Sequence, residues 1–216
     1  MGIGTALLKH LERLAADEAP IRQYVIRSEA LQSDAEAFYT RQGYTRDFVE
    51  LKLLRDLAAP LPNLPLEEID SWSAQNAPVF HTLYHESFSE RPGYRPIDPA
   101  EWIADHADYE TFRPNLSLIA RSDGQPAGFI TVFLNDETPQ EGYISQVGTS
   151  PRSRGRRIGA GLITAVMAKL KDEGLTSACL HVNENNARAI GVYEQLGFER
   201  VGRRGKFSRI PTKSVY

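Results

Sequence analysis

The sequence predicts a mixed α/β fold in which a central, mostly antiparallel sheet is flanked by helices. Two observations lead to this fold class. A strand at 143–149 is joined by a glycine-rich turn to a helix that begins near Ile158. Upstream, apolar runs at 116–121 and 127–134 flank the turn Asp123-Gly124, which is the pattern of a β-hairpin. Hairpin strands followed by a strand–turn–helix unit indicate a mixed sheet covered by helices.

Hydrophobic periodicity and turn residues place the individual elements. The first helix, for example, is predicted because Ile3, Leu7, Leu11 and Leu14 fall on one helical face. The predicted elements in chain order are helix 2–16, strand 21–27, helix 34–41, strand 48–54, helices 78–88 and 99–109, strands 116–121, 127–134 and 143–149, helix 158–173, strand 178–182, a helix starting near Asn186, and strands 198–203 and 206–210.

The first 57 residues repeat a later part of the chain. Gly2-Ile3-Gly4 corresponds to Arg157-Ile158-Gly159, and the run Tyr39–Tyr44 corresponds to Tyr193–Phe198. The offsets, 159 − 4 = 155 and 193 − 39 = 154, are about one domain length. We therefore expect three parts. Residues 1–57 form a partial, non-catalytic half-domain, 58–66 form a linker with three prolines, and 67–216 form a complete domain.

Composition limits the function classes. The 216 residues are 41% hydrophobic and 25% charged, as in an ordinary globular protein. A net charge of −3 argues against a general nucleic-acid binder, and no apolar run approaches the ~20 residues that span a bilayer. The single cysteine, Cys179, cannot form an internal disulfide, so we expect a cytoplasmic protein.

The turn before Ile158 has the composition of a phosphate site. Its glycines leave backbone N–H groups uncovered at the positive end of the helix dipole. Four arginines lie between Arg152 and Arg157 and can add charge-assisted hydrogen bonds. The Gly-Lys-Ser/Thr sequence of P-loops is absent, and the glycine spacing does not fit the dinucleotide fingerprint. The turn therefore indicates a different phosphate-bearing ligand.

Two motifs resemble those of the GNAT superfamily of N-acetyltransferases. Arg154 and Gly159 fit the ends of its acyl-CoA signature, Gln/Arg-x-x-Gly-x-Gly/Ala, although Arg157 replaces the middle glycine. A second signature, Asn-x-x-Ala-x-x-x-Tyr-x-x-x-Gly-Phe, is matched by Asn186, Ala189, Tyr193 and Gly197-Phe198. The resemblance spans about residues 67–210, and with the repeat it extends to the tandem-domain type that includes mycothiol synthase.

The resemblance implies acetyl-CoA as the cofactor and no metal. In the family, two neighbouring strands splay apart, and the pantetheine arm of the cofactor inserts between them. Here those strands would end at 147–149 and 180–183, and the turn 154–160 would hold the pyrophosphate. The implied cofactor-binding residues are Val147, Gly148, Thr149, Arg154, Gly155, Arg156, Arg157, Ile158, Gly159, Ala160, Asn186, Arg188, Ala189 and Tyr193.

The same resemblance implies the catalytic groups. A backbone N–H near Gly148 or Thr149 would stabilise the oxyanion, a contribution of about 3 kcal/mol per donor. Tyr193 matches the tyrosine that protonates the departing thiolate, although a packed aromatic is the alternative. For the base, His181 and Glu141 both stay open, because an imidazole titrates near neutrality but a strand histidine can also be purely structural.

The predicted function is transfer of acetyl from acetyl-CoA to a primary amine of a small molecule by direct attack. The alternative is a non-catalytic acyl-CoA-binding regulatory module. The first copy carries Arg27 and Gln32 where His181 and Asn186 would align, so we expect no catalysis there. We expect a monomer or homodimer that binds neither nucleic acid nor membranes. Four aromatics of the helices at 78–109 contact either substrate or core: Tyr84, Phe88, Tyr94 and Trp102.

Overall fold

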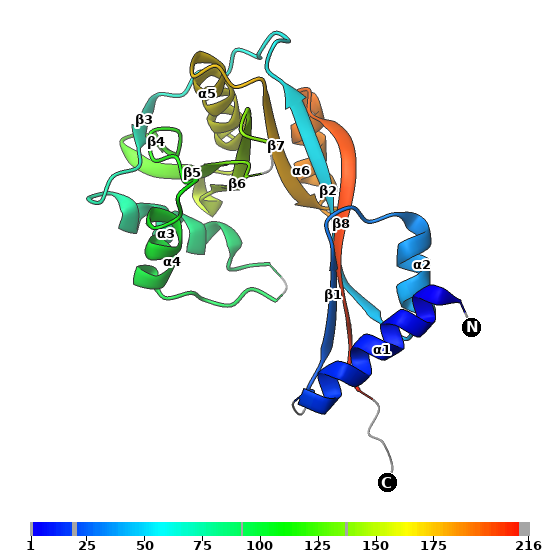
Figure 1. Ribbon diagram of the computed structural model, residues 1–216. Coiled ribbons are helices and arrows are strands. Elements are labelled where there is room, and N and C mark those ends of the chain that lie inside the picture. Colours follow the sequence, from blue (N-terminus) through cyan, green and yellow to red (C-terminus); the bar gives the residue numbers. More distant parts are fainter. Residues whose placement is uncertain (1, 19–20, 92, 137, 212–216) are drawn as a thin grey trace. The chain divides into compact units, whose positions relative to one another are not determined.

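The computed structural model describes residues 2–18, 21–91, 93–136 and 138–211 (Figure 1). The elements in chain order are α1 (Ile3–Glu18), β1 (Tyr24–Ser28), α2 (Ser33–Arg41), β2 (Thr45–Asp56), β3 (Glu68–Ser71), α3 (Ala77–Phe88), α4 (Pro99–Ala107), β4 (Leu118–Ser122), β5 (Gln125–Leu134), β6 (Glu141–Thr149), the 3-10 helix η1 (Pro151–Ser153), α5 (Ile158–Asp172), β7 (Ser177–Asn183), α6 (Ala187–Gln195) and β8 (Glu199–Arg209). None of the described helices is long and apolar enough to cross a membrane.

The larger of two compact units comprises Leu53–His181 and Ala187–Arg200. Its strands follow the order β7-β6-β5-β4-β3, with a parallel β6–β7 pair and antiparallel pairs elsewhere in this series. Helix α5 covers one face of the strands, and α3 and α4 cover the other (Figure 1). A Cβ added at Gly128 would meet Ile158 of α5, whereas one at Gly148 would meet Ser87 of α3. These contacts confirm the predicted fold class, a mixed sheet flanked by helices.

Two apolar layers hold this unit together. On one side of the strands, the predicted face of α5 is buried, with Leu162, Val166 and Leu170 fully enclosed. On the other side, Trp102 of α4 packs in an aromatic cluster that includes Phe129 of β5. Enclosing large aromatic side chains contributes strongly to stability, because each removes a large apolar area from water.

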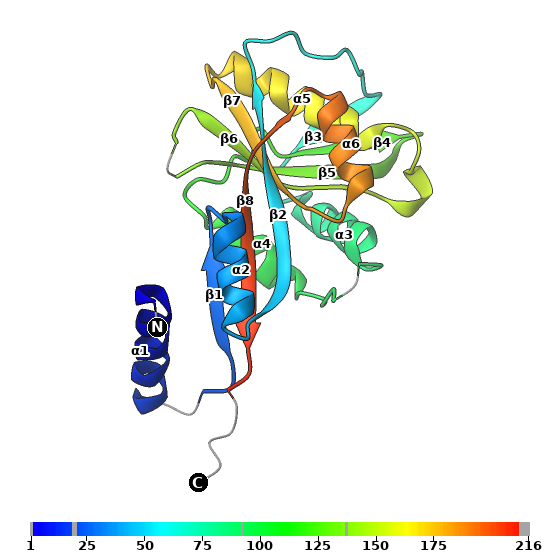
Figure 2. The ribbon, with the colours of Figure 1, turned by 90° about the vertical axis from the view of Figure 1, so that its right-hand side faces the viewer.

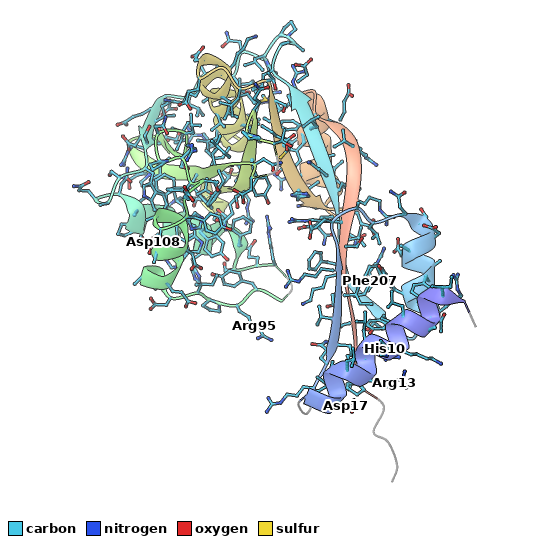
Figure 3. All side chains as sticks on the ribbon, in the orientation of Figure 1. His10, Arg13, Asp17, Arg95, Asp108 and Phe207 are labelled. Atoms are coloured by element: carbon cyan, nitrogen blue, oxygen red, sulfur yellow. The ribbon has the colours of Figure 1, made fainter. Side chains whose placement is uncertain are left out.

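The smaller unit contains the chain up to Lys52, Val182–Asn186 and the chain from Val201. Its strands follow the order β1-β8-β2, and β1 is antiparallel to β8 from Tyr24↔Arg209 to Ser28↔Gly205. Helices α1 and α2 lie on the same side of these strands, and α2 runs alongside them (Figures 1 and 2). Phe207 of β8, marked in Figure 3, is fully enclosed in a small core formed with α2 and β2.

Helix α1 is confirmed, but the apolar face that predicts it lies in solvent. Its four apolar side chains are exposed by 89, 57, 53 and 49%: Ile3, Leu7, Leu11 and Leu14. The helix is held instead by a neighbouring face. Glu12 accepts hydrogen bonds from the hydroxyl of Tyr44 at 2.8 Å and, through its carbonyl, from Tyr24 at 3.3 Å.

Two elements differ from the predicted ones. The expected strands 198–203 and 206–210 are one continuous strand, β8, and the prediction of two strands is wrong. Gly205 makes no turn there, because it pairs with Ser28 and packs against Leu31, which a Cβ would approach to 2.9 Å. Strand β3 was not expected. It is short and acidic, and it pairs with β4 beside an Arg121–Asp70 ion pair of 2.7 Å.

The compact units also do not follow the predicted division at 57 and 67. Residues from Val201 cluster with the first 52 residues, because β8 pairs with β1 in the smaller unit. The predicted copies are therefore units of sequence repetition, whereas the compact units are set by strand pairing.

Candidate active site

Strands β6 and β7 stop pairing halfway along their length. Their parallel register runs from Glu141↔Ser177 to Ile144↔Leu180, whereas β6 continues to Thr149 and β7 to Asn183. The β5–β6 register shifts at the same level, which leaves Ser145 as an extra residue. A β-bulge bends the strand that carries it. Within the described residues, β7 therefore leaves the edge of β6 beyond Ile144 unpaired.

The turn after β6 presents backbone N–H groups at the start of α5. Gly155 and Arg157 adopt left-handed conformations, with φ of +84° and +59°. The first hydrogen bond within α5 runs from the Gly161 N–H to the Arg157 carbonyl at 2.9 Å. The N–H groups of 158–160 therefore have no partner inside the helix. Such groups, at the positive end of a helix dipole, suit a phosphate.

Gly159 brings this helix start against the end of β6. A Cβ at Gly159 would lie 3.3 Å from Thr149 Oγ1 and 3.9 Å from the Val147 side chain. The predicted cofactor residues 147–149 and 154–160 therefore come together at one place. A larger residue at Gly159 would occupy the space over the exposed N–H groups.

The arginines of the turn are mostly held by nearby carboxylates. The ion pairs are Arg152–Glu86 at 3.7 Å, Arg154–Glu90 at 2.8 Å, Arg156–Asp123 at 2.8 Å and Arg156–Glu67 at 3.6 Å. Arg157 is exposed and forms no ion pair with the described residues. Exposed ion pairs contribute little free energy, so these arginines remain able to bind a phosphate.

Tyr193 lies in the last turn of α6. The Tyr-x-x-x-Gly-Phe part of the Asn-x-x-Ala-x-x-x-Tyr-x-x-x-Gly-Phe signature forms a helix cap there. Gly197 has φ of +84° and its N–H donates to Glu194, while the Phe198 N–H donates to the Tyr193 carbonyl at 3.0 Å. This is a Schellman motif, which needs glycine at the left-handed position and an apolar residue after it. The rings of Tyr193 and Phe198 accordingly lie 6.0 Å apart. The Tyr-x-x-x-Gly-Phe spacing thus has a structural cause of its own.

Arg91 is a residue that the sequence did not single out. Its guanidinium lies 3.7 Å from the centre of the Phe88 ring, and its charge acts on Tyr193 and Tyr84. Burial raises the pKa of Tyr193 to about 12, and the positive charge of Arg91 partly opposes this. No local sequence signal indicates this pairing, because Arg91 and Tyr193 are a hundred residues apart.

His181 occupies the first β7 position beyond the last paired residue, Leu180. Its ring lies 5.6 Å from that of Tyr143 on β6, in an edge-on arrangement. Cys179, two residues earlier, is fully enclosed in the core. The histidine therefore stands where the two strands part, whereas the thiol is a core group. The described residues contain no group of three His, Cys, Asp or Glu side chains that could hold a metal.

Glu141 lies at the opposite end of β6 from Gly148. It is buried at the first position of the strand and accepts a hydrogen bond from the Asn135 side chain. Gly148 lies seven positions further along the strand, which corresponds to roughly 23 Å. The structure does not bring Glu141 to the place where the strands part.

Asn186 directly precedes α6, which begins at Ala187 and carries Arg188 and Ala189. Its N–H donates to the Asn183 carbonyl at 2.9 Å, so it belongs to a tight turn after β7. The Arg188 side chain is exposed.

Helix α3 lies against β6 at Gly148, where a Cβ would meet Ser87, and it packs on α4. Of the four aromatics, Trp102 is core at 2% exposure, whereas Tyr84, Phe88 and Tyr94 are half-buried. Four buried polar atoms on α3, β5 and β6 have no hydrogen-bond partner among the described residues: Glu86 Oε2, Ser87 Oγ, Thr131 Oγ1 and Gln146 Oε1. Thr131 and Gln146 are directly opposite each other. Sequence analysis did not single out these polar residues. Hydrophobic periodicity assigns them to strands or a helix but does not distinguish them from other residues of those elements.

Comparisons with known proteins agree with this geometry. The sequence is 31% identical to the mycothiol acetyltransferase of Frankia casuarinae over 91% of this chain and 61% of that protein, and 28% identical to that of Salinispora arenicola over 92% and 66%. The chain thus spans about two thirds of these relatives or less. A GCN5-related N-acetyltransferase from Sphaerobacter thermophilus superposes with a TM-score of 0.75 at 21% identity, covering 97% of this chain and 68% of that one.

A tandem GNAT protein from the clavulanic acid biosynthesis pathway superposes with a TM-score of 0.65 at 20% identity, covering 98% of this chain and 71% of that one. At these identities the two structures establish the fold alone. The sequence profile described as "Acetyltransferase (GNAT) family" matches residues 78–198, which is more than half of the chain. The chain therefore belongs to the acetyltransferase (GNAT) family, whose members take their acetyl group from acetyl-CoA.

Proposed function

We propose that this chain transfers acetyl from acetyl-CoA to a primary amine of a small molecule. The observation that carries the proposal is the open edge of β6 beyond Ile144, which leads directly into the N–H groups at 158–160. An extended arm with amide groups fits the first feature, and a pyrophosphate fits the second. Acetyl-CoA contains both, and when bound it supplies an acyl thioester.

The residues of the chain have distinct roles in this proposal. A backbone N–H at Gly148 or Thr149 polarises the thioester carbonyl. The amine nitrogen attacks the carbonyl carbon, the N–C bond forms and the C–S bond breaks. The amine loses a proton to a base, and the departing sulfur gains one from the phenol of Tyr193. Since the pKa of Tyr193 is raised to about 12, the phenol holds its proton at neutral pH.

For the base we favour His181 over Glu141. His181 stands where β6 and β7 part, whereas Glu141 is at the other end of β6. An imidazole near neutrality can accept the ammonium proton directly or through a water molecule.

In this proposal the acceptor amine contacts the half-buried rings of Tyr84, Phe88 and Tyr94 and the oxygens of Ser87 and Thr131, which have no hydrogen-bond partner among the described residues. Polar oxygens beside aromatic rings suit an amine that carries further hydrogen-bond donors. Because relatives of this chain are named mycothiol acetyltransferase, the amine precursor of mycothiol is the first compound to test. We further propose a cytoplasmic monomer or homodimer without nucleic-acid or membrane partners. In it, residues 67–216 form the catalytic copy and residues 1–57 a non-catalytic one.

The test is release of free CoA thiol from acetyl-CoA in the presence of a panel of primary amines. Steady release with at least one amine is expected, and Tyr193→Phe should slow it roughly 10²-fold or more. A chain that binds acetyl-CoA in calorimetry but releases no thiol with any amine would be the alternative, a non-catalytic acyl-CoA-binding module. Release that is equally fast without any amine would contradict amine acetylation.

A further inference from the structure

A polar residue interrupts an aromatic face of β5. Phe129, Thr131 and Phe133 alternate along the strand and therefore point to the same side of the sheet. Both phenylalanines belong to or pack against the aromatic cluster that α3 and α4 form on that side. The Thr131 side chain between them is 0% exposed. A hydroxyl group in such surroundings is costly unless it has a hydrogen-bond partner.

Two further polar residues lie beside Thr131 on this face. Gln146 of β6 is directly opposite Thr131, and Gly148 is directly opposite Phe129, so all four share one face of the sheet. A Cβ added at Gly148 would lie 2.6 Å from Ser87 Oγ of α3 and 2.6 Å from the Phe129 ring. Ser87, Thr131 and Gln146 thus form a polar row on the face that α3 covers.

The polar row has unused hydrogen-bonding capacity. Each of its three residues has a buried oxygen without a partner among the described residues, and leaving such atoms unsatisfied is costly. Thr131 is fully enclosed, whereas Ser87 and Gln146 are half-buried, so the row leads from the core toward the surface. Glu86 Oε2 is also unsatisfied, but the other oxygen of that carboxylate lies 3.7 Å from Arg152, outside the row.

The two facing side chains of the row suit a hydroxyl group. Gln146 Oε1 can only accept a hydrogen bond, whereas the Thr131 hydroxyl can donate one. A hydroxyl group between them satisfies both, because its oxygen accepts from Thr131 and its proton is donated to Gln146. Gln146 lies two positions before Gly148 on β6, which corresponds to roughly 7 Å. Since a hydrogen bond spans about 2.8 Å, this hydroxyl would be a few bonds away from an amine that reacts beside Gly148.

We infer that Thr131 and Gln146 determine acceptor specificity by binding a hydroxyl group close to the reacting amine. The inference rests on the proposed function, and it specifies the acceptor as an amino alcohol. The ring of Phe88, 6.2 Å from that of Phe129, offers the carbon atoms of such an acceptor an apolar contact. All of these residues belong to the larger unit.

The test compares ethanolamine with propylamine, which are similar in size and differ in a hydroxyl group. Release of CoA thiol gives kcat/KM for each amine. We expect the unaltered chain to prefer ethanolamine at least about 10-fold, because propylamine leaves Thr131 and Gln146 unsatisfied. Thr131→Val and Gln146→Met remove the hydrogen bonds at similar size. Each should reduce the preference to within about threefold and leave the KM of acetyl-CoA within about twofold. Thr131→Ser keeps the hydroxyl and should retain the preference.

Thr164→Val on α5 is the matched control. Thr164 is also buried, but its hydroxyl already donates to the Ala160 carbonyl at 3.0 Å, and its loss should leave the preference unchanged.

Thermal unfolding without any amine provides a second measurement. Thr131→Val should keep or raise Tm, because no hydrogen bond within the fold is lost. A lowered Tm would show that the hydroxyl serves the fold, for example through a bound water molecule, and would overturn the inference.

The rates also distinguish failure of the inference from failure of the proposed function. A preference that survives both Thr131→Val and Gln146→Met, or that is lost equally in Thr164→Val, would overturn the inference while the proposed function stands. So would an unaltered chain that acetylates other primary amines but shows no preference for ethanolamine. If the unaltered chain acetylates no primary amine, the proposed function fails, and the inference fails with it.

Discussion

Helices α1 and α5 begin with corresponding sequences but lie in different surroundings. Ile158 and Leu162 of α5 are 7 and 0% exposed, whereas Ile3 and Leu7, 155 positions earlier, are 89 and 57% exposed. Helix α5 packs on β4, β5 and β6. The described part of the smaller unit has β1, β8 and β2, and no counterpart of those three strands beside α1. The same apolar face is therefore core where a sheet covers it and surface where none does.

Helices α2 and α6 show the opposite relation, because their ends have the same structure. Gly43 has φ of +81°, and the Tyr44 N–H donates to the Tyr39 carbonyl at 3.1 Å, as Phe198 does to Tyr193. Both copies thus use the Tyr-x-x-x-Gly-aromatic run to build the same helix cap. The cap depends on local sequence alone, whereas burial of α1 requires strands from elsewhere.

The two copies also surround their tyrosines differently. The ring of Tyr39 packs on Phe207 at 5.1 Å, inside the small apolar core. The positive charge of Arg91 instead acts on Tyr193 and partly opposes the rise of its pKa by burial. The tyrosine of the shared run therefore packs in an apolar core at one place and lies under the influence of a positive charge at the other.

The largest expected effect tests the burial of the two helices. Leu162→Ala should lower the free energy of unfolding by about 3–5 kcal/mol, because it opens a cavity in a closed core. Leu7→Ala should cost less than about 0.5 kcal/mol, because that side chain is already exposed. Urea denaturation measures both. A comparable loss in Leu7→Ala would mean that the α1 face is covered in solution.

The next comparison separates the two tyrosines. Tyr193→Phe should lower kcat by roughly 10²-fold or more and leave acetyl-CoA affinity within about twofold, because only proton donation is lost. Tyr39→Phe should change neither. Since burial raises the pKa of Tyr193 to about 12, deprotonation of this phenol should cause no alkaline loss of activity up to about pH 10. Equal rates for Tyr193→Phe and the unaltered chain would make this tyrosine structural as well.

A third pair of variants tests the glycine at each helix start. At 100 times its dissociation constant, acetyl-CoA should stabilise the chain by about 2.7 kcal/mol. Gly159→Val should abolish this thermal shift, because a Cβ there already lies 3.3 Å from Thr149 Oγ1. Gly4→Val, the matching change in α1, should preserve it, since its Cβ would make only ordinary contact with Phe38 at 3.4 Å. A shift that survives Gly159→Val would place the pyrophosphate elsewhere.

A smaller effect concerns the base. His181→Ala should lower kcat/KM about 10- to 100-fold at neutral pH and remove the acidic limb of the pH–rate profile. Glu141→Gln should leave that limb in place. The corresponding residue of the first copy is Arg27, which stays charged and cannot accept a proton. An acidic limb that persists without His181 would return the assignment to Glu141 or to water.

Sequence patterns predicted the fold well where local chemistry decides it. The apolar face of α5, the turn at Asp123-Gly124 and the glycine at each helix end follow from periodicity or from positive φ. They also predicted that residues 147–149 and 154–160 lie close together, and Gly159 does approach Thr149 and Val147. They could not predict the short strand β3, which is stabilised by pairing with β4.

Contacts between residues far apart in the sequence could not be predicted either. Gly205 continues a strand because it packs against Leu31. Arg91 acts on Tyr193 because of the way the loop after α3 folds. The face of α1 could be predicted as apolar but not as exposed, because exposure depends on which strands lie beside it.

The smallest expected effect tests whether the shared helix cap is structural in both copies. Gly197→Ala and Gly43→Ala should each lower the free energy of unfolding by about 1–2 kcal/mol, because alanine is strained at φ of +84° and +81°. Gly197→Ala should cost slightly more, since its Cβ would lie 3.0 Å from the Arg55 guanidinium, whereas the Gly43 Cβ would lie 3.5 Å from Arg209. Urea denaturation measures the loss, and kcat measured well below the transition separates stability from activity. If both variants lose stability and only Gly197→Ala loses kcat, the cap also orients Tyr193. If neither variant loses stability, the glycines are not needed for the cap, and other residues must cause the similarity of the two helix ends.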